Sequence, residues 1–339
     1  MSQRLRRAWQ QRGPLARLLW PLAQLYRLLA TLRRQLYRAG WLRSTRLPVP
    51  VIVVGNVIAG GAGKTPVTLA VVHHLQAAGW QPGVISRGYG RSTSDCRAVL
   101  AGSDAAEVGD EPLLIARASG APVFVARRRA DAARTLLAAH PATDVLVCDD
   151  GLQHLALARD VEICVFNDAG VGNGWLLPAG PLREPWPRPV DLIVDAGQLA
   201  AGSAPRFAMQ RTLAPYAIDR EGSRTPLQAL RGRRLHALAA IARPEDFFAQ
   251  LRAQGLQPQT EQPLPDHDDL RGWQPPADAA TVVLCTEKDA VKLWPRHPQV
   301  LAVPLQVRID PGFFTALDAR LASLSFPATP RTRHGPETA

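Results

Sequence analysis

A glycine-rich segment between a short apolar run and a helix-forming stretch constrains the fold of this chain more than any other feature. The apolar run covers residues 51–54, and the segment reads Gly60-Gly61-Ala62-Gly63-Lys64-Thr65-Pro66. Small residues let backbone N–H groups wrap around a phosphate chain, the lysine reaches the terminal phosphates, and the threonine can bind magnesium. Proline is tolerated in the first turn of the helix that follows. We therefore expect a P-loop that binds a nucleotide through this segment.

This loop departs from the plain P-loop pattern in one respect. In that pattern the first glycine stands five residues before Gly63, and here Ile58 occupies that position. The doublet Gly60-Gly61 makes the loop a shifted variant. The alternative is a chance Gly-Lys-Thr in a strand-to-helix turn. The chain uses arginine almost everywhere else, so a lysine at position 64 favours phosphate binding.

Apolar runs and helix-forming stretches alternate along the first two thirds of the chain. Strands are expected at 51–54, 83–86, 122–125, 145–148, 161–166 and 192–194, with helices at 65–78, 111–118 and 128–139. Such alternation is typical of a parallel sheet, and apolar strands without polar alternation are buried on both faces. The predicted fold class is α/β, with a mostly parallel, P-loop NTPase-like sheet and helices on both faces.

A second, smaller α/β lobe is expected towards the C-terminus. Its pattern is a strand at 235–241, a helix at 244–253 and a strand at 281–285, while 206–211 and 303–309 are expected to pair as strands that link the lobes. The predicted organisation is a basic amphipathic segment at 1–46, the P-loop core at 47–212, the second lobe at 213–325 and a disordered tail at 326–339.

The positive charge of the chain is confined to one end. The net charge is +11, but the first 94 residues hold thirteen arginines, Lys64 and no acidic residue, which leaves the remainder at −3. A nucleic-acid-binding surface on the globular part would make that part basic as well. We therefore expect no nucleic-acid partner.

The basic end contains a predicted amphipathic helix. Apolar residues at 15, 18, 19, 22, 25, 29, 32 and 36 follow helical spacing, with most of the arginines on the other side. Pro21 is expected to kink this helix or to move its start. Arg17 and Arg27 interrupt the apolar run, so it is too short to cross a bilayer, which takes about 20 apolar residues. We expect the helix to lie on an anionic membrane surface; the alternative is that it packs on the body and exposes its arginines.

Two adjacent carboxylates follow the predicted strand at 145–148. A P-loop needs a carboxylate at the end of a neighbouring strand to hold the ligand shell of magnesium, and Asp149 and Asp150 are placed to supply it. A turn or a helix cap is the alternative role for such a pair.

Several further segments carry glycines and polar residues that packing does not require. They are Gly55-Asn56, Ser86-Arg87-Gly88-Tyr89-Gly90-Arg91, Gly109-Asp110-Glu111-Pro112, Asp149-Asp150-Gly151-Leu152-Gln153-His154, Leu177-Pro178-Ala179-Gly180-Pro181-Leu182-Arg183-Glu184, Pro265-Asp266-His267 and Thr286-Glu287-Lys288-Asp289. In this order, from about residue 15 to 310, the chain resembles the tetraacyldisaccharide 4'-kinase family of Gram-negative bacteria. One departure is that the family commonly continues after its Asp-His with a second histidine and an aromatic residue, whereas Asp268, Asp269 and Leu270 follow here.

The resemblance implies a membrane-associated P-loop kinase. Such an enzyme transfers the γ-phosphate of ATP, with Mg²⁺, to the 4'-hydroxyl of tetraacyldisaccharide 1-phosphate and forms lipid IVA in lipid A biosynthesis. ATP is then the expected co-substrate, Mg²⁺ the expected cofactor and the glycolipid the expected partner. The expected location is the cytoplasmic face of the inner membrane, where the basic helix contacts the anionic leaflet.

The resemblance also implies roles for individual residues. Asp110 is expected to be the base that takes the hydroxyl proton, with support from His267, and Thr65 with Asp149 or Glu184 is expected to bind Mg²⁺. Taken alone, Asp110 also suits a helix cap and His267 a solvated loop. The other expected site residues are Tyr89, Arg91, Asn173 and Arg183 for the substrate, and Glu111, Asp150, Gln153, His154 and Lys288 in supporting positions.

A second class of enzyme shares the loop and the helix. Membrane-cycling positioning ATPases combine a similar glycine-rich loop with an amphipathic helix and hydrolyse ATP as a switch. They depend on a second lysine just before the glycine doublet, and position 59 is alanine in this chain. The kinase is therefore the favoured hypothesis.

Overall fold

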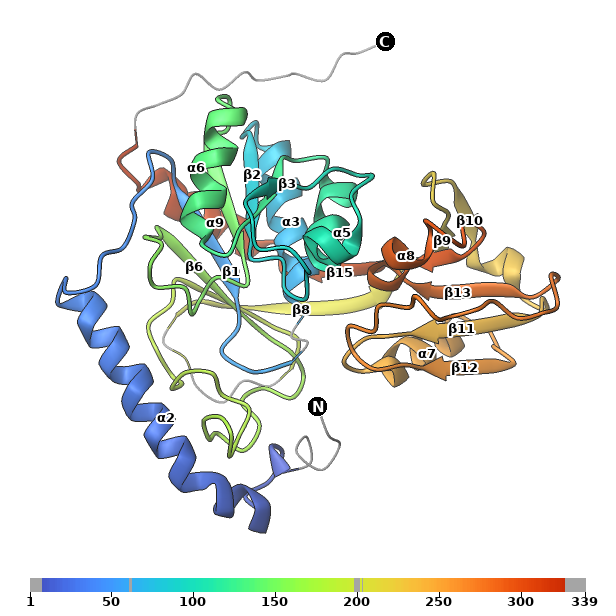
Figure 1. Cartoon of the computed structure of the whole chain (residues 1–339), viewed down its shortest axis with the longest axis horizontal. Coiled ribbons are helices and arrows are strands. Elements are labelled where there is room, and N and C mark those ends of the chain that lie inside the picture. Colours follow the sequence, from blue (N-terminus) through green and yellow to red (C-terminus); the bar gives the residue numbers. More distant parts are fainter. Residues whose placement is uncertain (1–7, 61–62, 198–201, 203, 327–339) are drawn as a thin grey trace.

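The computed structural model describes residues 8–60, 63–197, 202 and 204–326, and they form two lobes that lie side by side (Figure 1). The larger lobe is built on a nine-stranded sheet with the order β15-β8-β7-β6-β1-β5-β2-β4-β3. Neighbouring strands from β8 to β4 are parallel, and the two edge strands, β15 and β3, are antiparallel to theirs. The strands are β1 (Val51–Gly55), β2 (Pro82–Ser86), β3 (Arg97–Ala98), β4 (Val123–Val125), β5 (Val145–Asp149), β6 (Val161–Phe166), β7 (Leu192–Asp195), β8 (Arg206–Leu213) and β15 (Leu305–Ile309).

Helices cover both faces of this sheet, as the sequence predicts. On one face Ile52 and Val54 share a buried cluster with helical residues such as Val71, Ile115 and Phe313. On the other face Val51 and Val53 share one with Ala133 and Ala23, which come from two further helices. Because successive residues of a strand point to opposite faces, strands with no polar position need apolar partners on both sides. The helices of the larger lobe are α3 (Lys64–Ala77), α4 (Ala105–Val108), α5 (Asp110–Ser119), α6 (Arg129–Ala139) and α9 (Gly312–Ala322).

The smaller lobe has a six-stranded sheet with the order β10-β9-β14-β13-β11-β12. Phe247 and Phe248 of one helix are buried on one face of this sheet, and Ala290 and Leu293 of another are buried on the opposite side. The elements are β9 (Tyr216–Ile218), β10 (Arg224–Pro226), the short helix η1 (Leu227–Leu230), β11 (Leu235–Ala239), α7 (Pro244–Ala253), β12 (Thr260–Pro263), β13 (Val282–Thr286), α8 (Glu287–Leu293) and β14 (Leu301–Val303). The expected strand–helix–strand pattern of this lobe is confirmed.

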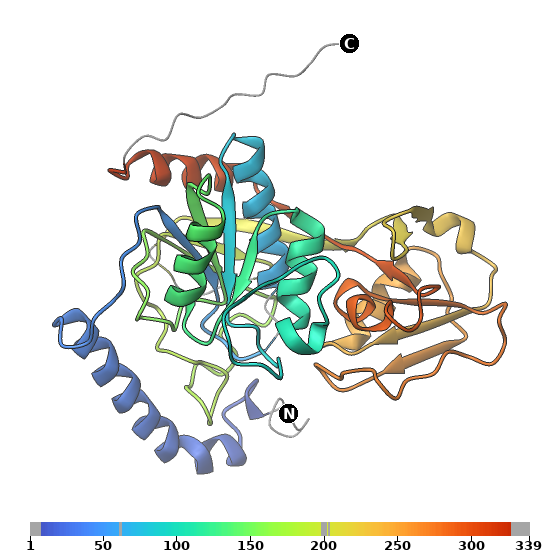
Figure 2. The same ribbon diagram turned by 45° about the horizontal axis from the view of Figure 1, so that its top comes forward.

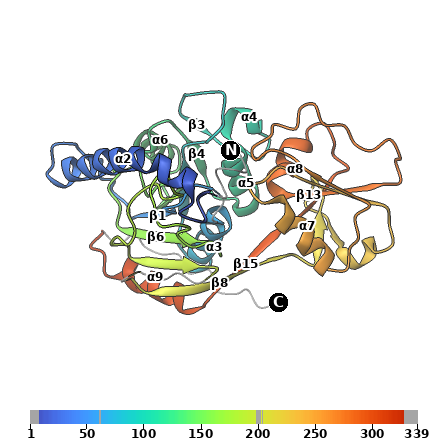
Figure 3. The same ribbon diagram turned by 90° about the horizontal axis from the view of Figure 1, so that it is seen from below.

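Two paired strands link the lobes. β8 and β15 run antiparallel, with Met209 opposite Ile309 and Leu213 opposite Leu305. They extend from the larger sheet towards the smaller lobe (Figure 3). This pairing confirms the expectation for segments 206–211 and 303–309.

The range predicted for the second lobe is wrong at its end. α9 lies within 213–325, yet it returns to the larger lobe, where Phe313 packs against Phe207 of β8 and Phe314 stacks on His74 of α3. Asp318 also bonds to His74 at 2.9 Å. The apolar side of α9 needs the open face of the larger sheet beside β7 and β8, and this requirement is not visible in local periodicity.

The N-terminal segment forms one continuous helix, α2 (Pro14–Arg38), along one side of the larger lobe (Figure 2). The expectation that Pro21 moves the helix start is wrong, because the helix begins at Pro14 and contains Pro21 on its exposed side. Proline has no N–H, so the backbone carbonyl one turn before Pro21 lacks its helical hydrogen bond, and water can donate to it instead. The helix packs on the body in part, since Ala16 and Ala23 are buried and Ala23 joins the core of the larger lobe. Six leucines are more than half exposed, namely Leu18, Leu22, Leu25, Leu28, Leu29 and Leu32, and the membrane contact stays a prediction.

Candidate active site

The phosphate loop connects β1 to α3 at the carboxyl edge of the larger sheet. Gly61 and Ala62 lie outside the described residues. Gly63 caps the helix with φ 78°, a left-handed conformation that glycine adopts without strain. Lys64 begins the helix, and its Nζ lies 3.7 Å from Asp150 Oδ1. Thr65 and Pro66 follow in the first turn, so the loop has the strand–loop–helix setting that phosphate binding requires.

Asp149 is the last residue of the neighbouring strand β5 and Asp150 follows it, and the two carboxylates have different environments. Asp149 is almost fully buried and accepts a hydrogen bond from Thr68 Oγ1 at 3.1 Å. Burial, together with the negative charges of Glu111 and Asp150, raises the pKa of Asp149. Burial also acts to raise the pKa of Asp150, but the positive charges of Lys64 and Arg183 prevail and lower it. A buried carboxylate with a raised pKa beside a lysine is a position that a cation would stabilise.

The donor set at the loop fits Mg²⁺ only in part. Thr65 and Asp149 supply the hydroxyl and the carboxylate that P-loop enzymes use, and phosphates and waters complete such a shell. In the described part of the chain no three His, Cys, Asp or Glu side chains are grouped to hold a metal by themselves. Glu184 is engaged elsewhere, because its carboxylate pairs with Arg34 of α2 and with Arg188 and accepts from Gln153 Nε2 at 2.7 Å. Its role as a ligand stays a prediction.

Asp110 and His267 meet across the two lobes. Asp110 begins α5, which follows α4 and Gly109, and His267 follows β12 in the smaller lobe. His267 Nδ1 lies 3.3 Å from Asp110 Oδ2, and the other oxygen, Oδ1, accepts the Glu111 N–H at 2.9 Å. Asp110 therefore acts as more than a helix cap, and His267 is not a free loop residue.

The surroundings of this pair shift the pKa of Asp110 and the pKa of His267 in opposite directions. Burial acts to raise the pKa of Asp110, but the hydrogen bond from His267 and the positive charge of Lys288 lower it to about 2. The hydrogen bond to Asp110 raises the pKa of His267, against burial and the charge of Lys288. An ionised carboxylate thus orients the imidazole, and together the two groups are a suitable acceptor for a proton.

The loop after β2 places its two candidate residues differently. Tyr89 is 68% exposed, and its ring lies 5.2 Å from the ring of His267. Arg91 turns into its own loop, where it donates to the Asp95 carbonyl at 2.7 Å and to Thr93 Oγ1 at 3.4 Å. The position of Tyr89 beside His267 suits a sugar contact, whereas Arg91 would have to leave these partners to reach a phosphate.

Arg183 and Gln153 lie beside Asp150 and the start of the phosphate loop. Arg183 Nη1 lies 3.1 and 3.2 Å from the two oxygens of Asp150, and Gln153 Nε2 donates to the Asn56 carbonyl at 2.9 Å. His154 is partly buried, and burial with the charges of Arg129 and Arg159 lowers its pKa to about 4. Arg183 and Gln153 therefore support the start of the loop, while the supporting role of His154 stays a prediction.

Asn173 lies apart from this group. Its Nδ2 donates to the carbonyls of Ala8 and Ala179, at 3.1 and 2.9 Å, so it fastens the start of the N-terminal segment to the body. In this structure it holds backbone, and its predicted substrate contact remains a prediction.

Two residues that the sequence reasoning did not select belong to the site. Arg129 is buried and donates to the Asp150 carbonyl at 2.6 Å, which fixes the turn after β5. Asn56, the first residue after β1, is fully buried, and both polar atoms of its side chain lack a hydrogen-bond partner among the residues that the structure describes. A buried amide without partners is costly, so it calls for a functional reason. The Gly55-Asn56 segment was a signal for this position.

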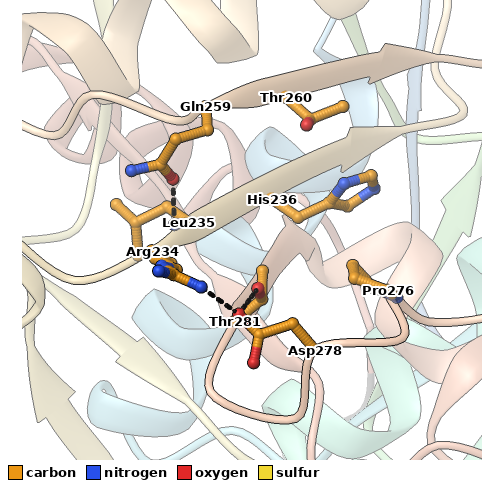
Figure 4. A pocket seen from close by; sticks show the side chains of 8 residues that line it. All are labelled: Arg234, Leu235, His236, Gln259, Thr260, Pro276, Asp278 and Thr281. Carbon is orange, nitrogen blue, oxygen red and sulfur yellow. Dashed lines mark hydrogen bonds and ion pairs between the residues drawn. The ribbon is translucent and has the colours of Figure 1, made fainter.

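The smaller lobe also has a pocket of about 330 Å³, which Figure 4 shows from close by. It borders Leu235 and His236 at the start of β11, whereas His267 lies beyond the carboxyl ends of β11 and β12. Its polar groups bond to one another: Arg234 pairs with Asp278 at 2.6 Å and Gln259 accepts the Leu235 N–H. This pocket is distinct from the candidate active site.

Together the two lobes define a P-loop phosphotransferase. The lysine of the phosphate loop faces a carboxylate at the end of the neighbouring strand, and a carboxylate–imidazole pair stands at the same edge of the sheet. A profile of the family described as Tetraacyldisaccharide-1-P 4'-kinase matches residues 15–322. The chain belongs to the tetraacyldisaccharide 4'-kinase family, and it is a kinase.

Individual relatives agree with this assignment. The chain is 71% identical over 325 residues to the tetraacyldisaccharide 4'-kinase of Acidovorax sp. (strain JS42), covering 96% of each chain. It is 49% identical over 338 residues to that of Methylibium petroleiphilum, covering 95% of this chain and 94% of the relative. The crystal structure of LpxK from Aquifex aeolicus in complex with ATP superposes with a TM-score of 0.80 at 27% identity, covering 91% of this chain and 99% of that one. The predicted fold class is thereby confirmed.

Proposed function

We propose that this protein transfers the γ-phosphate of ATP to the 4'-hydroxyl of tetraacyldisaccharide 1-phosphate and so forms lipid IVA in lipid A biosynthesis. The hydroxyl oxygen attacks the γ-phosphorus, and the bond from that phosphorus to the β–γ bridging oxygen breaks. The hydroxyl proton passes to the Asp110–His267 pair, and ADP leaves. The printed names of the relatives support this acceptor, and the ATP in the Aquifex aeolicus structure supports the donor.

The contact between Asp110 and His267 is the observation that carries the proposal. A sugar hydroxyl that attacks a phosphate must lose its proton. A positioned base typically raises the rate of such a step by about 10²- to 10⁴-fold. The two residues come from different lobes, so the pair forms only when the lobes are held together.

The phosphate loop supplies the donor side. The backbone of the loop and Lys64 are placed to bind the β- and γ-phosphates, and Thr65 and Asp149 are the residues we assign to Mg²⁺. When bound, this ion neutralises charge on the phosphates. Asp150 and Arg183 hold the lysine side of the loop in position, because Asp150 contacts both Lys64 and Arg183.

The amphipathic helix α2 suits a substrate with acyl chains. No helix in the described part of the chain has the length and apolarity needed to span a bilayer. The leucines of α2 that face away from the body form an apolar stripe next to arginines 17, 27 and 33, and such a helix lies in the interface of an anionic membrane. We propose that α2 holds the enzyme at the cytoplasmic face of the inner membrane.

Labelled phosphate tests the function directly. The purified protein is incubated with γ-labelled ATP, Mg²⁺ and tetraacyldisaccharide 1-phosphate in detergent micelles, and the lipid fraction is analysed. We expect label in the lipid and none with a Lys64→Met variant, which keeps the length of the side chain and removes its charge. Hydrolysis of ATP that leaves the lipid unlabelled would favour the positioning ATPase and contradict the proposal.

A further inference from the structure

Lys288 extends from the smaller lobe to the larger one. It stands in the first turn of α8, and its Nζ lies 3.4 Å from Glu111 Oε1, 3.7 Å from Asp110 Oδ2 and 3.7 Å from Asp266 Oδ1. Its side chain is 16% exposed. Glu111 and Asp110 belong to α5, so this single ammonium group contacts carboxylates of both lobes. An exposed surface lysine would have none of these contacts.

Lys288 also contacts the imidazole of His267. Its Nζ lies 3.4 Å from Nε2, while Nδ1 of the same ring faces Asp110 at 3.3 Å. An ammonium group has donors and no acceptor, so Nε2 must offer its lone pair to Lys288. The ring hydrogen is then on Nδ1 and is donated to Asp110. This geometry selects the neutral ring in one tautomer.

We propose that Lys288 is a positioning residue of the base, which joins Asp110 and His267 across the lobes and keeps the pair free of an extra proton. The inference rests on the proposed function, because it assigns a role within the same phosphoryl transfer. A cation beside an imidazole disfavours the protonated ring, and a cation beside a carboxylate favours the ionised form. Lys288 does both at once.

Binding of a substrate phosphate is the competing role for this lysine. Three carboxylates, those of Asp110, Glu111 and Asp266, stand within 4 Å of its Nζ. A phosphate placed there would meet their negative charges. The surroundings of Lys288 therefore suit a cation that serves the pair better than one that serves an anion.

The other charged groups around the pair come from three elements. α5 contributes Glu111, the segment after β12 contributes Asp266, and α8 contributes Asp289 and Lys292. Lys292 pairs with Asp289 at 3.1 Å and donates to the Asp268 carbonyl at 2.7 Å, so it contacts neither Asp110 nor His267. Burial acts to lower the pKa of Lys288, but the carboxylates around it raise the value, so it is a cation at neutral pH.

Variants at position 288 test this role. Lys288→Met and Lys288→Gln remove the charge, Lys288→Arg keeps it, and Lys292→Met removes the other buried lysine of the same helix. We measure kcat and KM for both substrates from pH 5.5 to 9. With the charge removed, the acid limb of kcat should move to higher pH, with about a tenfold loss near pH 6.5 and a much smaller loss near pH 9. Lys288→Arg should restore the wild-type acid limb. Lys292→Met should lower the melting temperature and leave the acid limb close to its wild-type position.

A titration that needs no substrate separates this inference from the proposed function. The ring signals of ¹³C-labelled histidine are followed by NMR in the nucleotide-free protein, and His267 is identified by its loss in His267→Asn. Its midpoint should rise in Lys288→Met and Lys288→Gln, whether or not the lipid proves to be the acceptor. A pH-independent loss of kcat, an increase in KM alone or an unchanged His267 midpoint would each overturn the inference.

Discussion

Asp110 and His267 are 157 positions apart in sequence and 3.3 Å apart in space, and each lobe supplies one of them. Their contact orients the imidazole ring, and it lowers the pKa of the carboxyl group and raises that of the imidazole.

Removing either member of the pair should slow the chemical step and spare nucleotide binding. For Asp110→Asn and His267→Asn we expect kcat to fall by about 10²- to 10⁴-fold, with KM for ATP within about threefold of wild type. The double variant should lose little more than either single one, because the two residues act as a unit. Initial rates with labelled ATP measure this, and a variant with near-normal kcat would show that the base is assigned wrongly.

The same pair should make folding stability depend on pH. The raised pKa of His267 adds stability that is fully present below the unfolded value, about 6.5, and is lost as the pH rises through the folded value. The lowered pKa of Asp110 adds stability that is present above its unfolded value, about 3.9, and is lost as the pH falls towards about 2. His267→Asn should therefore lower the melting temperature more at about pH 5.5 than at about pH 9.

His236 provides a control of opposite sign for this experiment. It is half-buried and bonds to Gln262, and its burial lowers its pKa. A lowered histidine pKa costs stability as the pH falls, so the penalty of His236→Asn should shrink at acid pH. Parallel slopes for the two variants would contradict the assignment at His267.

We predict that Asn56 lowers the stability of the nucleotide-free protein and strengthens nucleotide binding. Within the described part of the chain both polar atoms of this buried amide lack partners, and an unpaired buried polar group costs about 1–3 kcal/mol. Asn56→Leu should leave the melting temperature of the nucleotide-free protein unchanged or raise it, while the further stabilisation by Mg-ATP becomes smaller. Thermal shift with and without Mg-ATP measures both effects.

Asn167 gives the matched contrast for Asn56. It is also buried, but its Oδ1 accepts the Ala169 N–H at 3.1 Å. Asn167→Leu should lower the melting temperature of the nucleotide-free protein, because it removes a bond that is made. If Asn56→Leu destabilises to the same extent and leaves the Mg-ATP shift intact, the amide of Asn56 has a structural role only.

The exposed leucines of α2 should carry the membrane contact. Leu25→Glu with Leu29→Glu places two charges on side chains that are 54% and 56% exposed, so the fold should tolerate them. Binding to anionic vesicles should fall by at least about tenfold, since apolar burial and attraction to the leaflet are both reduced. Thr31→Glu with Gln35→Glu adds the same charge to exposed positions outside the leucine stripe and should have a smaller effect in the same sedimentation assay. Equal losses from the two pairs would indicate that charge alone governs binding.

Local patterns in the sequence determined the phosphate loop, the parallel sheet and the linking strands. Each of these depends on neighbours in the chain: glycines beside Lys64, apolar runs for strands, and a helix after the loop. The short polar strand β12, Thr260–Pro263, was missed for the converse reason, because its place at a sheet edge leaves it without an apolar pattern. The return of α9 to the larger lobe was missed as well, because periodicity does not say which lobe a helix covers.

The sequence by itself predicted a nucleotide-binding loop and its residues, because a P-loop is a local motif whose spacing carries its geometry. The roles of single polar residues were decided only by the tertiary structure. Glu184 pairs with arginines, Asn173 holds backbone, and Lys288 joins the base. The function of a charged side chain depends on the charges that stand within about 4 Å of it, and folding brings those from distant parts of the chain.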